Sequence, residues 1–498
     1  MGPVEGLPED QLGDVGFDLQ RNARNLNENS VEVRTPITKI PIEIISEIFD
    51  ISLSPEEPFE QHQRVAFMHL RCVCRLWRKI LFNTPAYWRG LTIPLGKTVE
   101  GEYVDPDLPT SVEVISQWFD RAGPHASVTL SFLPFSDPEA ISTATAEFAT
   151  RVMTVVATEK RRWDLIELPS LFIFSADIPL KERVVLKMLR AISLPQAETP
   201  WAYLDKVSLP INPVDPGEWP FQLNGPRSFE AALPKLKNLG LSWRCPWSLP
   251  ISHSSIESLD LALLNPVSTS VGLSILAQFP AIKDLALCAS NIHAMSEETA
   301  PLQPIRLDSL QGLNLTVSQQ ALEYAGRLEL PQLRFLLLVG GAPGTSLDLL
   351  SLTSTIRQTR VKALMITSPL RGRHVVALLS ASAKMEILTV RSLRFLKYAL
   401  DSDGIGTCLM PELKVLYVMK RLNATDLDNL VQYFGRRISA LGTGEVEPME
   451  SGQGLSVESG GRVPKKHGVT IIAIQDLSED AFVEEKARLR DYGVVLRC

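Results

Sequence analysis

The sequence predicts an α/β protein in which a small all-α module precedes a long solenoid of parallel strands with helices on the outside. Two observations carry this prediction. Apolar residues recur at helical spacing near the N-terminus, and a short apolar phrase then recurs at nearly constant intervals. The 498 residues carry a net charge of −7 and are 45% hydrophobic, which is ordinary for a folded chain and argues against a disordered or strongly basic one.

The helical module is expected at residues 36–95, after a flexible tail at residues 1–35 that is rich in Asn, Asp, Glu and Gly. Pro41 suits a first-turn position, where its missing N–H costs nothing. The first helix is expected to place its apolar residues on one stripe: Ile40, Ile44, Ile45, Ile48 and Phe49. One further helix is expected over residues 64–83, with a stripe of Leu70, Val73, Cys74, Trp77 and Leu81. Thr84-Pro85 ends it, because the residue before a proline resists the α conformation.

From residue 88 onward the chain repeats the phrase apolar-x-x-apolar-x-apolar twelve times, from Trp88/Leu91/Ile93 to Leu413/Leu416/Val418. The last eight phrases, whose third apolar residues run from Leu241 to Val418, follow one another at a mean step of about 25 residues, within the 20–29 residue period of leucine-rich repeats. Each phrase ends with the alternation of a short strand, and the segments between phrases hold helical patterns. A single repeat cannot bury its own apolar face, so neighbouring repeats must stack.

The array departs from the usual leucine-rich pattern at its turns. Such repeats normally carry Asn or Cys three residues after the third apolar position, and Asn212 matches after Leu209, but the next eight repeats have neither residue there. We therefore expect an irregular leucine-rich-repeat-like solenoid at residues 96–441, whose turns are satisfied in another way. A flexible Gly-, Ser- and Glu-rich loop is expected at 442–467, and a strand and helix at 468–498 are expected to cap the array.

Residues 36–95 resemble an F-box domain, whose pattern is roughly Leu-Pro-x-Glu with aliphatic residues in the first helix and Val-Cys-x-x-Trp in the last. Ile40 replaces the usual Leu, and the positions that match are Pro41, Glu43, Ile44, Ile48, Val73, Cys74 and Trp77. Thr84-Pro85 and Trp88 are also similar to the F-box-like proteins of mushroom-forming fungi. The resemblance covers about an eighth of the chain, and repeats of this kind commonly follow an F-box.

The resemblance implies a substrate-recognition subunit of a Skp–cullin–F-box ubiquitin ligase. The F-box would dock on the Skp-type adaptor of the cullin complex, and the array would hold an unknown target protein. The implied adaptor-binding residues are Ile40, Pro41, Glu43, Ile44, Ile48, Phe49, Val73, Cys74 and Trp77. A segment of ~50 residues is too small to bury all of its apolar surface, so its exposed aliphatic residues need a partner's groove.

Two alternatives stay open at this point. Ile40, Ile44, Ile48 and Trp77 could form the ordinary core of a helical cap on the solenoid, as their helical pattern alone would favour. The whole chain could also be a leucine-rich-like protein-interaction scaffold with no ubiquitin role.

The strand residues between and just after the buried positions are expected on the concave face of the solenoid. In the N-terminal half the candidate partner-binding residues are polar or acidic: Asn238, Asp260, Asp284 and Asn314. In the C-terminal half they are apolar: Phe335, Leu337, Met365 and Tyr417. A large apolar face is unusual in water, so it either binds a ligand or is covered by residues 468–498, and we expect coverage because it needs no partner.

No motif of catalytic, metal or cofactor chemistry stands out. The seven histidines are dispersed, the six cysteines form no CxxC pair, and neither HExxH, G-x-S-x-G nor a phosphate-binding glycine loop occurs in context. We therefore expect a protein that is not an enzyme and has no cofactor or metal. Its short basic runs do not suggest nucleic-acid binding, and no stretch reaches the ~18 apolar residues of a membrane span. The expected location is intracellular, cytoplasmic or nuclear or both.

Overall fold

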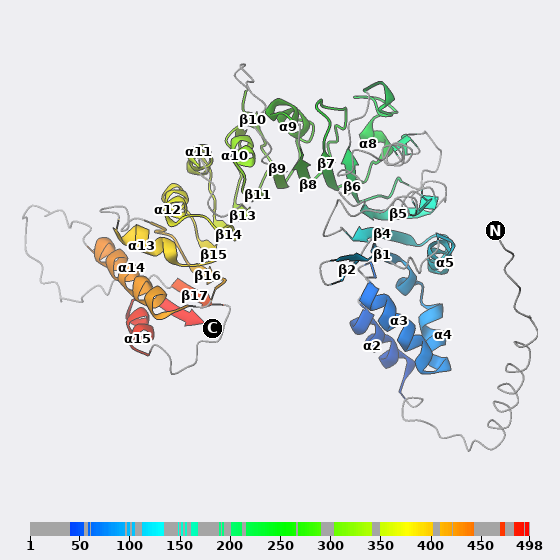
Figure 1. Cartoon of the computed structure of the whole chain (residues 1–498), viewed down its shortest axis with the longest axis horizontal. Helices are drawn as coiled ribbons and strands as arrows, with labels where there is room; N and C mark the ends of the chain where they lie inside the picture. Colours follow the sequence, from blue (N-terminus) through cyan, green and yellow to red (C-terminus); the bar gives the residue numbers. More distant parts are fainter. Residues whose placement is uncertain are drawn as a thin grey trace, which may run out of the picture.

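The chain builds one long parallel β-sheet that curves into an open arc, with the helices of the repeats on the outer side (Figure 1). The computed structural model describes the following residues: 40–53, 58–59, 61–94, 97–99, 102–104, 112–133, 148, 151–152, 155–156, 161–167, 189–190, 192–193, 201–211, 216–264, 267–289, 303–340, 349–401, 409–420, 422–442, 469–473, 483–492 and 494–497. The expected tail at 1–35 lies outside these ranges. So does the expected loop at 442–467, except for Gly442, which is the last residue of a helix and not part of a loop.

The helical module consists of α2 (Ile42–Leu53), α3 (Gln61–Val73), α4 (Arg75–Asn83) and the 3₁₀ turn η3 (Pro85–Trp88). The prediction of a single helix over 64–83 is wrong, because Cys74 is extended and separates α3 from α4. Its Sγ accepts a hydrogen bond from the Trp77 backbone N–H at 3.4 Å, so Cys74 caps the start of α4. The predicted helix end at Thr84-Pro85 is confirmed.

Fourteen strands form the sheet in nearly sequential order. They are β1 (Gly90–Pro94), β4 (Ser127–Leu133), β5 (Arg162–Glu167), β6 (Lys206–Ile211), β7 (Asn238–Trp243), β8 (Ser258–Leu263), β9 (Asp284–Ala289), β11 (Gly312–Thr316), β13 (Phe335–Val339), β14 (Ala363–Ile366), β15 (Ile387–Val390), β16 (Val415–Val418), β17 (Val469–Ala473) and β18 (Val494–Arg497). Each of the twelve sequence phrases places its second apolar residue in one of these strands, and Leu168 of the third phrase lies outside the described residues. This confirms the repeat prediction at the level of an α/β array of parallel strands.

The helices between the strands are α5 (Val112–Ala122), η6 (Pro216–Glu218), α8 (Phe229–Ala232), α9 (Thr269–Leu276), α10 (Gln319–Ala325), α11 (Leu350–Gln358), α12 (Gly372–Ala381), α13 (Arg394–Asp401), α14 (Ala424–Gly442) and α15 (Val483–Asp491). Two small sheets accompany them, an antiparallel pair β2 (Lys97–Val99) and β3 (Glu102–Val104), and a parallel pair β10 (Ile305–Arg306) and β12 (Leu328–Glu329). Helices α9 to α12 follow the outer side of the arc (Figure 1).

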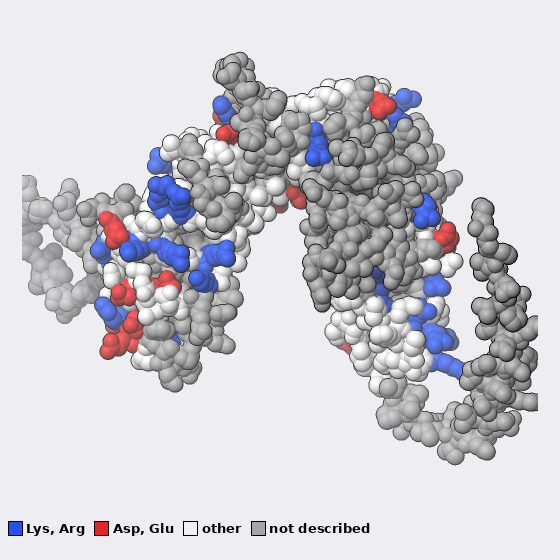
Figure 2. Space-filling view, in the orientation of Figure 1, with Lys and Arg blue, Asp and Glu red and all other residues white. Residues whose placement is uncertain are grey.

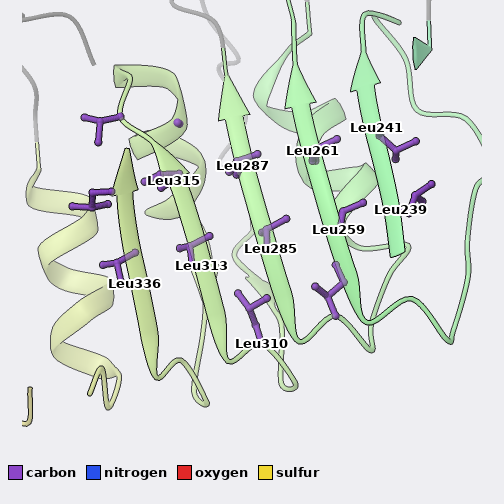
Figure 3. Close-up of a cluster of buried hydrophobic side chains, with 14 of the residues drawn as sticks. Leu239, Leu241, Leu259, Leu261, Leu285, Leu287, Leu310, Leu313, Leu315 and Leu336 are labelled. Carbon is purple, nitrogen blue, oxygen red and sulfur yellow. The ribbon is translucent and has the colours of Figure 1, made fainter. Parts of the chain in front are cut away.

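The core is a ladder of apolar side chains in register across the strands. Leu259 pairs with Leu285, Leu285 with Leu313 and Leu313 with Leu336, all at 1% exposure or less. Because these residues alternate with partly exposed ones along each strand, all of them enter the layer between the sheet and the outer helices (Figure 3). Each repeat therefore buries its apolar residues against both neighbouring repeats.

The turns that lack Asn or Cys are satisfied largely by the backbone. Arg244 and Leu264 stand at the expected Asn position, and each donates its backbone N–H to a carbonyl of the preceding strand, Ile211 O at 2.8 Å and Trp243 O at 2.9 Å. Ser318 occupies the same position after β11. Its hydroxyl donates to Ala289 O at 2.8 Å and accepts from the Ala321 N–H at 3.0 Å, which caps α10.

The C-terminal segment lengthens the sheet and does not cover its inner face. β17 pairs with β16 and β18 with β17, both in parallel, so these strands occupy the sheet edge that β16 would otherwise expose. The expectation that residues 468–498 shield the apolar concave face is therefore wrong for their described parts. The backbone N–H and C=O groups at the open edge of a sheet need hydrogen-bond partners, and β17 supplies them to β16. A strand that pairs at the edge cannot also cover the inner face.

Replacing Leu313 with Ala should destabilise the fold by about 2–5 kcal/mol, because a fully buried ladder residue loses its contacts to two neighbouring strands and leaves a cavity. The free energy of unfolding in urea measures this. Thr316→Ala, on the same strand but partly exposed, is the matched control and should cost less than about 1 kcal/mol. Equal losses in the two variants would contradict the stacked-ladder account.

Candidate functional site

Helix α2 is apolar on two faces, and the chain buries only one of them. Ile45, Phe49 and Leu53 face inward and are fully buried. Ile44 and Ile48, which the sequence pattern placed on the same stripe, point away from the core and are 46% and 42% exposed. The single-stripe expectation is therefore wrong, because residues 44 and 45 lie about 100° apart around a helix and only one of them can enter the same contact.

Of the other F-box-like positions, some are buried and others are exposed. Phe49 is the one that the structure removes from the candidate docking surface, because its ring is fully buried and packs edge-on against Trp77 with centroids 5.0 Å apart. Trp77 on α4 is partly buried, and its ring supports α2 through the contact with Phe49. Val73 is 49% exposed at the end of α3, and Cys74 serves as the cap of α4.

The start of α2 holds the three remaining motif residues. Pro41 is exposed, and its carbonyl accepts the Ile45 N–H at 3.1 Å, which is the first hydrogen bond of the helix. Ile40 is partly buried against the core. Glu43 is exposed in the first turn, where its carboxylate interacts favourably with the helix dipole. These residues fix where the helix begins, and Pro41 and Glu43 remain accessible on its surface.

The same two helices expose further apolar residues that the sequence analysis missed. They are Ile42 and Ile51 on α2 and Val65 and Met68 on α3. The signal for Ile51 was present in the sequence, since it lies three residues after Ile48 on the same side of the helix. We call the exposed residues Ile44, Ile48, Ile51, Val65 and Met68 the module surface. The space-filling view shows a largely uncharged surface over α2 and α3 (Figure 2).

A buried tyrosine ties α2 to the end of the module. Tyr87 in η3 is almost fully buried, and its hydroxyl donates to Asp50 Oδ1 at 2.6 Å. Burial, and then the hydrogen bond and charge of Asp50, raise the pKa of Tyr87 well above its ordinary value. Trp88 beside it donates its indole N–H to Leu81 O at 3.1 Å. The orientation of α2, and with it the module surface, is therefore fixed by the η3 segment.

An aromatic cluster joins the module to the array. Phe67 of α3 packs against Trp88 of η3 with centroids 5.0 Å apart, and Trp88 packs against Trp118 of α5 at 4.7 Å. Arg121, also on α5, places its guanidinium 4.6 Å from the Trp88 ring. Phe59 adds a backbone bridge, because its N–H and carbonyl bond to Gly90 and Thr92 of β1. The module is thus packed onto the first repeat and is not attached through a free linker.

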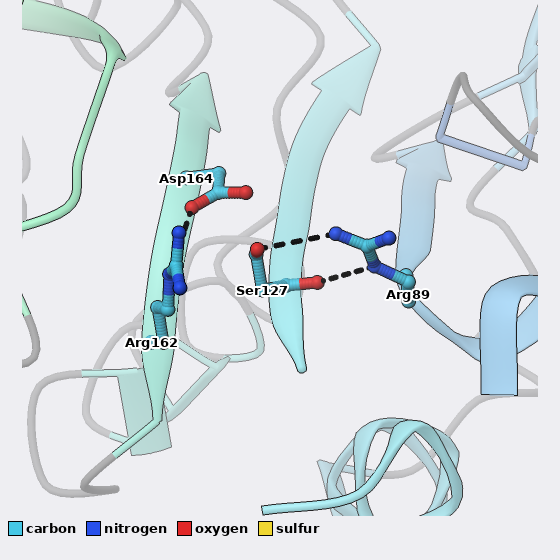
Figure 4. A network of polar contacts seen from close by, with 4 residues as sticks. All are labelled: Arg89, Ser127, Arg162 and Asp164. Carbon is cyan, nitrogen blue, oxygen red and sulfur yellow. Dashed lines mark hydrogen bonds and ion pairs between the residues drawn. The ribbon is translucent and has the colours of Figure 1, made fainter. Parts of the chain in front are cut away.

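Arg89, which lies between η3 and β1, adds hydrogen bonds to this junction. Its Nε donates to the Ser127 carbonyl at 2.9 Å, and its terminal nitrogen donates to the Ser127 hydroxyl at 3.1 Å (Figure 4). The Arg89 carbonyl accepts the Thr129 N–H at 2.8 Å. On β5, the next strand, the Nε atom of Arg162 lies 3.5 Å from Oδ1 of Asp164 (Figure 4). The residue that follows the module therefore hydrogen-bonds to β4 through both its side chain and its backbone.

The second candidate surface is the inner face of the sheet, where the structure places all eight predicted partner-binding residues. They fall into two in-register rows that run across the strands. One row holds Asn238, Ser258, Asp284, Gly312, Phe335, Ala363, Ile387 and Val415. The other holds Gly240, Asp260, Ala286, Asn314, Leu337, Met365, Thr389 and Tyr417. The sequence analysis missed Ile387, although it occupies the same repeat position as Phe335.

Charge lies along the rim of this face, at the start of the strands. Glu386 accepts hydrogen bonds from Lys414 at 2.6 Å and approaches Lys362 to 3.3 Å, and these two lysines hold the pKa of Glu386 below its ordinary value. On the face itself, partial desolvation raises the pKa of Asp260, and nearby Lys206 opposes that shift. The rim is therefore largely neutralised by its own ion pairs.

Among the described residues, no three His, Cys, Asp or Glu side chains gather closely enough to hold a metal ion. No helix in the described part of the chain is both long and apolar enough to span a bilayer. The chain matches no model of a known protein family, and a search of curated proteins finds no sequence that matches it.

Replacing Tyr87 with Phe should destabilise the protein by about 1–2 kcal/mol near neutral pH, because the bond to Asp50 is lost. Since the folded-state pKa is raised, the contribution of Tyr87 is fully present below about pH 10, the ordinary tyrosine value, and falls as pH rises beyond it. The stability gap between the two proteins should therefore narrow in alkaline solution.

Urea unfolding at pH 7.5 and pH 10.5 checks this expectation. Tyr203→Phe, at an exposed tyrosine just before β6, is the control and should change stability by less than about 0.5 kcal/mol. A Tyr87→Phe gap that stays constant or widens with pH would contradict the assigned role of the hydroxyl.

Proposed function

We propose that the chain is a non-catalytic substrate receptor of a Skp–cullin–F-box type ubiquitin ligase, in which the module surface docks the Skp-type adaptor and the inner face of the sheet holds the target. The observation that carries the proposal is the exposure of Ile44 and Ile48 on a helix whose opposite face is already filled by Ile45 and Phe49. These two isoleucines match the F-box pattern in sequence.

The energetics favour a protein partner for this surface. Exposing large aliphatic side chains to water is unfavourable, at about 25 cal/mol per Å² of apolar area, and Ile44 and Ile48 stay 46% and 42% exposed in the folded chain. An amphipathic groove of a partner could accept side chains at positions 44, 48 and 51, which have the i, i+4, i+7 spacing of a docked helix. Glu43 and Glu47 are exposed on the same helix and would lie at the rim of such a contact.

The junction to the array supports a receptor that holds its target in a set orientation. Phe67, Trp88 and Trp118 pack the module against the first repeat, and Arg89 binds it to β4. A target on the inner face would therefore lie at a defined position relative to a docked adaptor. A flexible linker would not give this geometry.

A leucine-rich-like scaffold with no link to ubiquitin is the second candidate function. It is favoured by the same exposed residues, because an apolar helix surface fits any helical partner equally well. The two candidates differ in one outcome, which is whether the purified chain binds a Skp-type adaptor.

Ile44→Asp combined with Ile48→Asp should abolish capture of a fungal Skp-type adaptor, with at least a tenfold loss of affinity, while the fold is retained. A charge in the centre of an apolar contact would be desolvated without a partner. Val483→Asp, which makes the same chemical change at an exposed residue of α15, should bind like the unchanged chain.

Binding is measured by titration with purified adaptor, and folding by circular dichroism and urea unfolding of each variant. Full adaptor binding by the folded double variant would rule out the module surface as the docking site. Failure of the unchanged chain to bind any adaptor would favour the scaffold function. Global unfolding of the double variant would favour the view that these isoleucines belong to the core.

A further inference from the structure

The stretch of the inner face that runs from β8 to β16 has two chemically different ends. On β13 to β16 the two rows hold Phe335, Leu337, Ala363, Met365, Ile387, Thr389, Val415 and Tyr417, none of them charged. Phe335 is 40% and Ile387 38% exposed, and the described C-terminal strands leave both accessible. These side chains neighbour one another in register on adjacent strands, so they form one apolar area and not scattered single residues.

The end on β8 and β9 carries two carboxylates in the same rows. Asp284 lies two strand steps from Phe335, with Gly312 between them. The Asp284 carboxylate fills the space above that glycine, because a Cβ on Gly312 would lie 2.3 Å from Asp284 Oδ1. The carboxylate therefore leans toward the apolar end. Figure 2 shows acidic atoms at the inner border of the arc, beside β8 and β9.

The second carboxylate, Asp260, lies three strand steps from Leu337 in the other row. Its cross-strand neighbours are Gly240 and Ala286, which offer it no side-chain hydrogen bond. The nearest cation of this region, Lys206, already forms an ion pair with Glu167. The two aspartates thus give the β8–β9 end of this stretch a negative charge, which Lys206 on β6 balances only in part.

We propose that the inner face binds an extended protein segment that carries a lysine or arginine at one end and apolar side chains at the other. The basic residue lies over Asp260 and Asp284, and the apolar residues cover the rows of β13 to β16. With strands about 4.8 Å apart, the two ends are about 10–14 Å from each other, a span that three or four residues of extended chain cover.

The inference specifies the target class of the proposed function and rests on it only for the assignment of this face to the target. The physical reasons are complementary charge at one end and removal of apolar area from water at the other. An acidic segment would be repelled by the aspartates, and a purely polar segment would leave Phe335 and Ile387 exposed.

The test is selection of a random twelve-residue peptide library displayed on phage against the immobilised full chain. The expected result is a consensus with Lys or Arg three or four residues from at least two apolar residues. The consensus peptide should then bind at least tenfold more weakly to Asp260→Asn/Asp284→Asn and to Phe335→Ser/Met365→Ser. Glu323→Gln, at an exposed carboxylate of the outer helix α10, is the matched control and should bind normally.

Several results would overturn the inference: no consensus, an acidic consensus, or a consensus peptide that binds both double variants with unchanged affinity. Urea unfolding establishes that each variant is folded. Adaptor capture is measured on the same proteins and should be unchanged in the inner-face variants. If the unchanged chain selects no such consensus but binds the adaptor, this inference alone is refuted. If the unchanged chain selects the consensus but does not bind the adaptor, only the ubiquitin role is refuted.

Discussion

The structure depends on one constraint, which is that no repeat can bury its own apolar face. Each strand contributes two or three large apolar residues to the layer under the outer helices, and those residues find enough contact only when the next strand pairs in register. In-register parallel pairing therefore determines which side chains are neighbours on both faces of the sheet. It stacks Leu285, Leu313 and Leu336 in the core, and it aligns the intervening side chains into rows on the opposite face.

The same constraint explains the two ends of the array. At the C-terminal end, β17 and β18 pair with the last repeat and occupy its edge. At the N-terminal end, the helical module closes the apolar layer by packing Phe67 and Trp88 against Trp118 of the first repeat. Because the module is small, α2 buries only one face in the module core, and Ile44 and Ile48 on its other face stay partly exposed. That second face is the one to which we assign the proposed docking.

The two candidate surfaces have different physical characters. The module surface is a helix stripe of aliphatic residues, suited to a groove in a helical partner. The inner face is broad and ordered in rows, with carboxylates at one end and apolar side chains at the other. The aromatic cluster and Arg89 hold the two surfaces in a set relation. Such an arrangement suits a protein whose role is to present one partner to another.

The sequence by itself determined the parallel array, its strand positions and the polar and apolar halves of the inner face, because alternation and a near-constant repeat step are local properties. Only the tertiary structure decided which side of α2 is free, so Phe49 left the candidate surface and Ile51 joined it. It also decided the break at Cys74 and the edge pairing of β17. These outcomes depend on contacts between residues distant in the chain, such as Tyr87 with Asp50, which no local periodicity encodes.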